Sequence, residues 1–126
     1  MTDDLELVQF MTAEIGDDLI LSFFVAKPHD PVHGRSIILM RDKKFEHLVA
    51  ESDRGVRVSD EDVPENEEAE DNFLEGIRIG NTVAEIETTH RRYKLDLRNV
   101  GESEVRAAKK VLKKMNYDKR FKLTVG

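Results

Sequence analysis

The sequence contains no cysteine and no tryptophan, and only 6% of its residues are aromatic. The absence of cysteine excludes a disulfide framework and any cysteine-ligated zinc site. No stretch approaches the roughly 18 apolar residues of a membrane-spanning helix. The first four residues, Met1-Thr2-Asp3-Asp4, are acidic where a signal peptide carries Lys or Arg. We therefore expect a cytoplasmic protein that does not enter a membrane.

Charge, in contrast, is abundant: 37% of the 126 residues are Asp, Glu, Lys or Arg, where about 25% is typical of globular proteins. The length fits a single domain over residues 1–126 with one hydrophobic core. The formal net charge is −6, but residues 91–122 hold twelve basic and four acidic residues, and the rest of the chain holds eight basic and twenty-two acidic ones. Such asymmetry can mark a binding surface, or simply two solvated faces.

The clearest structural pattern runs from residue 73 to residue 98 and predicts three consecutive strands. Two apolar-rich stretches, 73–79 and 82–88, are separated by Gly80-Asn81, which we expect to supply the positive φ angles of a tight hairpin turn. In the third stretch, Tyr93, Leu95 and Leu97 alternate with charged residues. This alternation is typical of a strand with one face in a core and the other in water.

The remaining apolar stretches complete the predicted fold. Further strands are predicted at residues 5–15, 19–26, 36–41, 45–51, 56–58 and 121–125, with a loop at 27–35. The run 19–26 is apolar on both faces, which predicts a central strand with both faces near the core. A helix is predicted at about 102–115, because Val105, Ala108, Leu112 and Met115 form one apolar stripe. We predict an α+β domain: a mainly antiparallel, strongly bent or partly closed sheet of about seven to nine strands, one C-terminal helix and a final strand.

An acidic segment, residues 59–71, is the first candidate binding site. It holds no basic residue and only one large apolar residue, Val63, so we expect a mobile loop within the domain. Such a loop can cover a basic surface and steer association with a basic protein. The candidate partner-binding carboxylates are Asp60, Glu61, Asp62, Glu65, Glu67, Glu68, Glu70 and Asp71. Their spacing lacks the Asp-x-Asp-x-Asp-Gly pattern of a calcium-binding loop.

The basic region 91–122 offers an alternative function, nucleic-acid binding. The candidate residues lie on the predicted helix: Arg106, Lys109, Lys110, Lys113 and Lys114. A cluster of cations is most of what phosphate neutralisation requires. Against this, the whole chain is acidic and the helix has no aromatic residue to stack on bases. Lysines on the wet side of a helix also serve solubility alone.

Metal binding and catalysis have less support. His29, Asp30 and His33 offer imidazole and carboxylate groups, which are good zinc ligands. They lie in a proline-containing loop whose spacing fixes no geometry, so a polar surface loop is the favoured interpretation and no cofactor is expected. The sequence has no nucleophile elbow, glycine-rich phosphate loop or two-histidine helix motif. We therefore predict a protein without enzymatic activity.

Four pieces of the chain follow one another in a recognisable order. They are residues 17–23, the strand 37–41, the strands around Gly76-Ile77, and residues 93–97 with the helix and last strand behind them. In this order the chain resembles the small, β-rich immunity proteins of bacterial polymorphic toxins. The resemblance implies a cytoplasmic protein that binds and blocks a toxin domain and has no activity of its own. The acidic segment would suit a basic partner such as a nuclease. The oligomeric state stays open.

Overall fold

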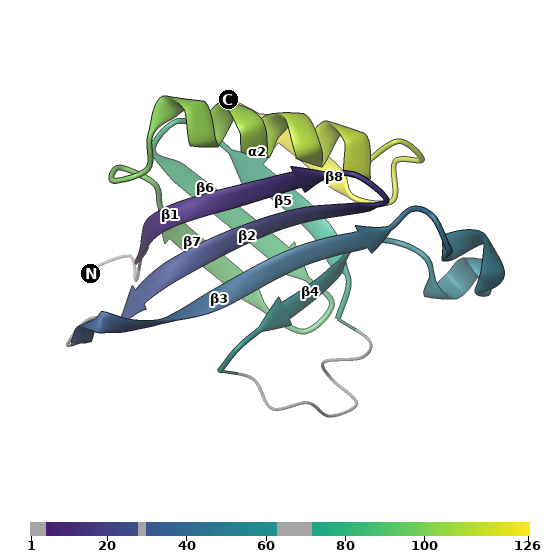
Figure 1. The fold of residues 1–126 in the computed structure, drawn as a ribbon, viewed down its shortest axis with the longest axis horizontal. Coiled ribbons are helices and arrows are strands. Elements are labelled where there is room, and N and C mark those ends of the chain that lie inside the picture. The colour runs from purple at the N-terminus through teal and green to yellow at the C-terminus, as the bar shows by residue number, and fades with distance from the viewer. Residues whose placement is uncertain (1–4, 28–29, 63–71) are drawn as a thin grey trace.

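The computed structural model describes residues 5–27, 30–62 and 72–126, with residues 30–33 described by their backbone alone. Within these ranges the chain forms one eight-stranded sheet and one α-helix (Figure 1). The strands are β1 (Glu6–Ile15), β2 (Asp18–Lys27), β3 (Asp30–Asp42), β4 (Arg57–Asp60), β5 (Leu74–Ile79), β6 (Val83–Thr88), β7 (Arg92–Asp96) and β8 (Lys122–Val125). The α-helix α2 (Glu102–Met115) lies between β7 and β8 in the chain, and the 3₁₀ helices η1 (Glu46–Leu48) and η2 (Glu51–Asp53) lie between β3 and β4. The predicted α+β class is confirmed.

The sheet has the order β4-β3-β2-β1-β7-β6-β5-β8, and most neighbouring strands are antiparallel. Two pairs are parallel. β8 runs along β5 for four residues, whereas β1 and β7 share only two residue pairs. Figure 1 shows β1, β2 and β3 in front of β5, β6 and β7, so the sheet bends strongly at the short β1–β7 junction. It therefore has two halves, β1–β4 and β5–β8.

The edge of β4 that does not pair with β3 forms hydrogen bonds with the chain at the start of β5. Arg57 and Phe73 form an isolated bridge, the Val58 N–H donates to the Asn72 carbonyl at 2.9 Å, and the Leu74 N–H donates to the Val56 carbonyl at 2.8 Å. These bonds bring the two halves together without the continuous ladder of a barrel. The predicted strongly bent or partly closed sheet is confirmed.

One hydrophobic core fills the space between the two halves and the helix. β2 contributes Leu21 and Phe23, and β7 contributes Leu95, from alternate positions on the strands. α2 lies across the top of the sheet in Figure 1 and packs mainly against β1 and β2. Its predicted stripe is buried, and Val111 is buried beside it. The helix bounds agree with the prediction.

The predicted strand at 45–51 is wrong: the chain forms η1 and η2 there. The Phe45 N–H donates to Asp42 Oδ1 at 3.1 Å, which closes a turn at the end of β3. The Glu46 carboxylate then turns back onto Arg41, whose Nε lies 2.9 Å from Glu46 Oε2. These contacts with earlier residues compete with extended backbone, and periodicity along the segment could not reveal them.

The predicted loop at 27–35 is largely strand, because β3 begins at Asp30. The β2–β3 register changes between Ala26, which pairs with Gly34, and Lys27, which pairs with Asp30. The residues between Asp30 and Gly34 have no partner in the β2–β3 register, and proline in a strand is tolerated at such an irregularity.

The hairpin turn after β5 also differs from the prediction. Neither Gly80 nor Asn81 has a positive φ; among the described residues only Gly55 and Lys119 do. The connection spans residues 80–82 and is closed by the Gly80 N–H, which donates to the Val83 carbonyl at 2.9 Å. The longer connection removes the need for left-handed backbone.

Candidate functional site

The acidic segment begins inside the fold. Asp60 is the last residue of β4, and its carboxylate accepts hydrogen bonds from Arg35 Nε and from the Tyr93 hydroxyl, both at 3.1 Å. Its side chain is only 7% exposed, so it holds the chain's own strands together. Glu61 accepts a hydrogen bond from the Ser36 N–H at 3.1 Å. Asp62 lies near Lys27 and Arg35. The remaining candidate carboxylates, Glu65, Glu67, Glu68, Glu70 and Asp71, lie outside the described residues.

Arg35 forms a cluster of charges at one end of the interior. Its guanidinium forms a two-point ion pair with Glu6 and a further bond to Asp60. The hydrogen bond to Glu6 raises the pKa of Arg35, because it favours the charged guanidinium. Burial and the neighbouring Asp60 raise the pKa of the Tyr93 hydroxyl, which therefore stays a hydrogen-bond donor. All polar groups of this cluster have partners, which indicates a structural role.

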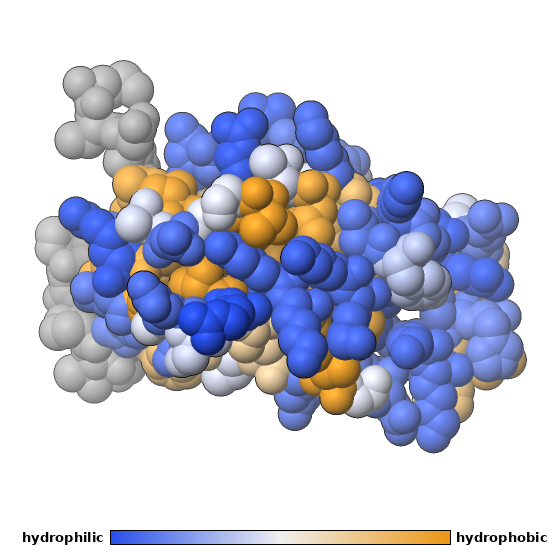
Figure 2. Space-filling view, turned by 90° about the horizontal axis from the view of Figure 1, so that it is seen from above, coloured by the Kyte–Doolittle hydropathy of each residue, from blue (hydrophilic) through white to orange (hydrophobic). Residues whose placement is uncertain are grey.

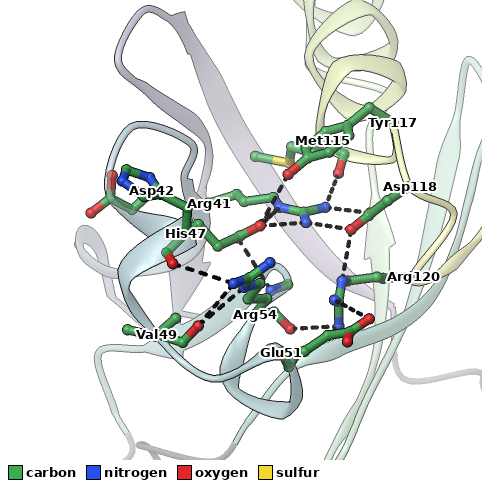
Figure 3. Close-up of polar contacts among 12 residues, drawn as sticks. Arg41, Asp42, His47, Val49, Glu51, Arg54, Met115, Tyr117, Asp118 and Arg120 are labelled. Atoms are coloured by element: carbon green, nitrogen blue, oxygen red, sulfur yellow. Dashed lines mark hydrogen bonds and ion pairs between the residues drawn. The ribbon is translucent and has the colours of Figure 1, made fainter.

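A second cluster surrounds Arg41 at the other end of β3 (Figure 3). Its fully buried guanidinium bonds to Glu46, to Asp118 at 2.7 Å and to the Met115 carbonyl at 2.7 Å. Tyr117 stacks on it at 4.3 Å and donates its hydroxyl hydrogen bond to Glu46. These contacts fasten η1 and the end of α2 to β3. Such a satisfied buried network is a structural element rather than a reactive site.

The cations of the helix are exposed in part. Arg106, Lys110, Lys113 and Lys114 lie on the solvent side of α2, and within the described residues none forms an ion pair. Lys109 instead donates hydrogen bonds to Asn81 Oδ1 at 3.2 Å and to the Gly126 carbonyl at 3.3 Å. Figure 2 views the molecule from above, the side on which α2 lies in Figure 1, and shows a largely hydrophilic surface with hydrophobic patches between.

The described side chains do not include the residues proposed as metal ligands, His29, Asp30 and His33. His29 lies outside the described residues, and Asp30 and His33 are described by backbone only, within β3. Among the side chains that are described, His, Asp and Glu form no group of three that could hold a metal ion. In the same part of the chain, no helix is both long and apolar enough to cross a membrane.

The two halves of the sheet present different outer faces, meaning the sides turned away from the core. The outer face of β5–β8 is charged. Its exposed residues include Glu75, Arg78, Glu85, Glu87, Arg92, Lys94 and Lys122. Opposite charges pair across strands there, as Arg78 with Glu85 and Glu85 with Lys94. A shallow hollow of about 250 Å³ lies over Gly76, where no side chain fills the surface. This is an ordinary solvated sheet face.

The outer face of β1–β4 is different, and the sequence analysis did not single it out. Its middle is uncharged: Phe10, Thr12, Ile20, Ser22, Phe24, Ser36, Ile38, Met40 and Ser59. The Phe10 and Phe24 rings stack with centroids 4.9 Å apart, and Phe10 is 46% exposed. Charged residues surround this middle part: Glu14 on β1, Asp18 on β2, Asp42 on β3, Arg57 on β4 and Glu61 just after β4. We call the nine residues of the middle part the uncharged face.

A groove continues the uncharged face at one end. It has a volume of about 440 Å³, and its apolar lining consists of Phe45, Leu48 and Val49 with Met40 of the uncharged face. Its charged lining consists of Asp42, Glu46, Asp53 and Arg57. Leu48 is 71% exposed and Phe45 is 52% exposed. Large apolar side chains are thus presented to solvent over a continuous stretch of one side of the molecule.

One sequence signal could have located this surface. The run 19–26 is apolar at both alternating sets of positions, and we predicted that both faces of the strand lie near the core. In the structure only one set, represented by Leu21 and Phe23, is buried. The other set, represented by Ile20 and Phe24, is half-buried on the outer face.

Comparison of the chain with protein-family models, with curated proteins and with solved structures finds no match. The functional argument therefore depends on the residues of this chain.

Proposed function

We propose that this chain is a non-enzymatic protein-binding domain and that the uncharged face is the surface its partner covers. One observation carries the proposal: within a single sheet, one outer face is covered by charges and the other has uncharged residues across its middle. Strands that face only water normally carry polar and charged side chains. Contiguous exposed apolar patches of several hundred Å² mark interaction sites.

The composition of the uncharged face supports this function. The cores of protein interfaces are depleted in charge and enriched in aromatic residues and Met. Phe10, Phe24 and Met40 supply such residues, and the adjoining groove adds Phe45. Serine and threonine side chains lie between them and can form hydrogen bonds with a partner.

The face is also rigid before any partner arrives. Its residues lie on paired strands, and the Phe24 ring lies over Gly34, where an added Cβ would be 2.9 Å from the ring. Side chains fixed in this way lose little conformational entropy on binding. Phe10 stacks on Phe24 from the solvent side and remains about half exposed, so it is available to a partner.

The resemblance to immunity proteins adds a prediction about the partner class, a toxin domain. In that case the carboxylates of the acidic segment would face a basic partner, and the uncharged face would supply the apolar contact. Apolar burial provides most of the affinity and charge complementarity guides the encounter.

The experiment compares binding by three proteins: wild type, Ile38→Lys and Lys94→Glu. Each is immobilised and exposed to extract from the source cells, and captured proteins are identified, purified and measured again by calorimetry. We expect Ile38→Lys to weaken binding at least tenfold, because a lysine would be buried at the centre of the interface without a partner. Lys94→Glu, on the charged outer face, controls for the change of charge.

The folding of both variants is checked by circular dichroism. Equal binding by wild type and Ile38→Lys would contradict the proposal, and so would an equal loss in Lys94→Glu.

A second candidate function is nucleic-acid binding, supported by the exposed cations of α2. Lys110, Lys113 and Lys114 have no ion-pair partner among the described residues, so their charge is available. Fluorescence anisotropy with duplex and single-stranded probes should then give an affinity that falls linearly with salt on a log–log plot. The double variant Lys113→Glu/Lys114→Glu should abolish it, whereas Lys94→Glu should not. No binding at low salt would exclude this function.

A further inference from the structure

We propose that the groove beside η1 anchors the protein partner, which inserts a large apolar side chain there next to a basic residue. This inference rests on the protein-binding function proposed above and names the chemistry of the segment that the partner presents. It follows from the apolar lining of the groove and from the carboxylates around it.

The apolar part of the groove comes mainly from the connection after β3 rather than from the sheet. Phe45, Leu48 and Val49 lie close together in the sequence, and their exposed fractions are 52%, 71% and 44%. Met40 of the uncharged face completes this lining. Single exposed apolar residues are normal in proteins, but three together beside a groove of about 440 Å³ form a site into which an apolar side chain fits.

Hydrogen bonds hold the walls of the groove in place without involving its apolar side chains. The Glu46 carboxylate accepts bonds from the Arg41 guanidinium and, at 3.3 Å, from the Gly55 N–H. Arg54 donates to the Val49 carbonyl at 3.1 Å (Figure 3). The groove is therefore formed before a partner arrives, so filling it costs little conformational entropy. Pockets of this kind hold the anchor residues of protein interfaces.

Two carboxylates of the groove lack a cationic partner. Asp42 and Asp53 are exposed, and among the described residues neither forms an ion pair. Asp42 also lies beside Asp18, its partner in the β2–β3 register. Burial and the neighbouring Asp42 carboxylate raise the pKa of Asp18, as expected where like charges lie together. A cation from the partner would relieve this repulsion.

The other two charges that line the groove are already engaged within the chain. Glu46 is paired with the buried guanidinium described above. The Arg57 guanidinium lies over the Phe73 ring at 4.9 Å and has further interactions within the chain. Lys44, which precedes Phe45, is paired with Asp17 at 3.6 Å. The charge still to be matched is therefore negative, and it fits a lysine or arginine of the partner.

The groove continues the uncharged face, so a single partner can cover both. Met40 belongs to both surfaces, and a segment anchored in the groove brings the rest of the partner over the sheet. Four of the five charged residues around the face are acidic: Glu14, Asp18, Asp42 and Glu61. Interfaces have an apolar centre and a polar rim with complementary charge. The expected partner surface is therefore apolar at its centre and basic at its rim.

Selection from a peptide library supplies the probe for this inference. Phage that display random short peptides are selected on immobilised wild-type protein, and the enriched peptides are synthesised with a fluorescent label. Their dissociation constants are measured by fluorescence anisotropy. We expect the enriched peptides to combine a leucine, isoleucine, methionine or aromatic residue with a lysine or arginine close to it in sequence.

Two variants separate the apolar part of the groove from its charged part. Leu48→Ser should weaken peptide binding at least tenfold through the lost apolar contact, and the fold should be kept because this side chain is largely exposed. Asp42→Asn/Asp53→Asn should weaken binding by about threefold to tenfold, since exposed ion pairs are individually weak. It should also remove most of the salt dependence of binding. The amide oxygen at position 42 can still accept the hydrogen bond from the Phe45 N–H that closes the turn.

The matched control Glu75→Gln/Glu85→Gln removes two charges from the other outer face and should leave peptide binding unchanged. A second comparison replaces the basic residue of the peptide by glutamine. This change should weaken binding to wild type but have little effect on binding to Asp42→Asn/Asp53→Asn, because the contact is already lost there. Circular dichroism verifies that every variant is folded.

The outcomes separate this inference from the function it rests on. A selection that yields no peptide dependent on Leu48 overturns the groove as an anchor. Binding that needs Leu48 but not the two carboxylates overturns the basic residue and indicates an uncharged apolar occupant. Self-association of the wild type that Leu48→Ser abolishes overturns the inference in favour of a second copy.

The protein-binding function has its own readout, the partner captured from extract. If its capture is lost in Ile38→Lys but kept in Leu48→Ser, that function stands and the anchor in the groove is wrong. If neither the peptides nor a captured partner depends on either surface, both proposals are wrong.

Discussion

Arg35 and Arg41 both point inward from β3, at opposite ends of its pairing with β2. Each is an arginine beside a core otherwise built largely from apolar residues, and each is matched by at least two carboxylates. A buried guanidinium without these partners would cost several kcal/mol. The two clusters therefore explain why so charged a chain can bury arginine at both ends of its interior.

The pH dependence of stability follows from the Arg41 cluster. The hydrogen bond from Arg41 lowers the pKa of Asp118 well below its usual range. For Glu46, burial acts to raise the pKa, but the hydrogen bonds from Arg41 and Tyr117 outweigh it, so the pKa is also lowered. Groups with lowered pKa values stabilise the fold above their unfolded pKa values of about 4, and this contribution is lost as the pH falls towards the folded ones. Acid should therefore weaken this cluster.

We predict that Asp118→Asn lowers the free energy of unfolding at pH 7 by about 2 kcal/mol, because Arg41 loses one of its charged partners. The difference from wild type should shrink as the pH falls below about 5, because Asp118 takes up a proton in the unfolded chain at a higher pH than in the folded one. Urea unfolding at a series of pH values measures this. Asp17→Asn, at an exposed carboxylate, is the control and should change little. If the stability difference between wild type and Asp118→Asn stays constant with pH, the negative charge of Asp118 is not what stabilises the fold.

Among the elements, the β2–β3 ladder is packed most closely at one point on its outer side. Gly34 lies beneath the Phe24 ring, and Phe10 of β1 covers Phe24 in turn. An aromatic ring over a strand glycine shields backbone that would otherwise be open to water. The same stack that stabilises the hairpin also forms one end of the uncharged face.

We predict that Gly34→Ala lowers the free energy of unfolding by about 1–3 kcal/mol. The new Cβ would lie 2.4 Å from the Val25 carbonyl oxygen and 2.9 Å from the Phe24 ring, so the backbone must shift. Gly76→Ala is the matched control in β5, since its Cβ would meet nothing closer than 3.7 Å. Denaturant unfolding of both variants measures the effect. Equal stability changes at the two positions would contradict this account of the packing.

The helix is held by packing and by charge at its ends. Glu102 and Glu104 lie in its first turn and Lys113 and Lys114 in its last, as the helix dipole favours. Glu104 also accepts a hydrogen bond from the Met11 N–H at 3.3 Å, which joins the start of α2 to β1. The buried side of α2 thus closes the core while its exposed lysines remain in solvent.

At the scale of the whole molecule, the two halves of the sheet share one core. The β1–β7 junction has only two residue pairs, so the ladder alone would connect the halves weakly. The buried side chains of both halves and of α2 nevertheless form a single hydrophobic cluster. Since neither half has a core of its own, we expect the domain to unfold as one unit.

We predict that urea unfolding followed by far-ultraviolet circular dichroism and by tyrosine fluorescence gives coincident transitions. Leu39→Ala in β3 and Ile86→Ala in β6 remove buried side chains from opposite halves, and each should lower the free energy of unfolding by about 2–4 kcal/mol. Both probes should shift together in both variants. Two separated transitions, or a shift of one probe alone, would show that the halves fold independently.

The sequence by itself determined most of the local structure. The apolar stripe of α2 and the alternation at Tyr93, Leu95 and Leu97 are properties of neighbouring residues, so periodicity was sufficient to predict them. The bent α+β sheet followed from the number and length of the apolar stretches. The strand predicted at 45–51 was wrong because Glu46 bonds back to Arg41. Arg41 is in turn bound by Asp118, which is far away in the sequence, so local periodicity could not reveal this contact.

Only the tertiary structure decided the strand order and which faces are covered. A strand such as β2 has two apolar faces in the sequence, but periodicity cannot tell whether the second face meets a core, a partner or water. That depends on which element packs against it, and here α2 and β5–β8 cover the inner face of β2 alone. The candidate site is therefore a consequence of packing. In β2 both faces carry apolar side chains, but the fold has only one helix, which packs on the inner face. The outer face of β1–β4 remains exposed.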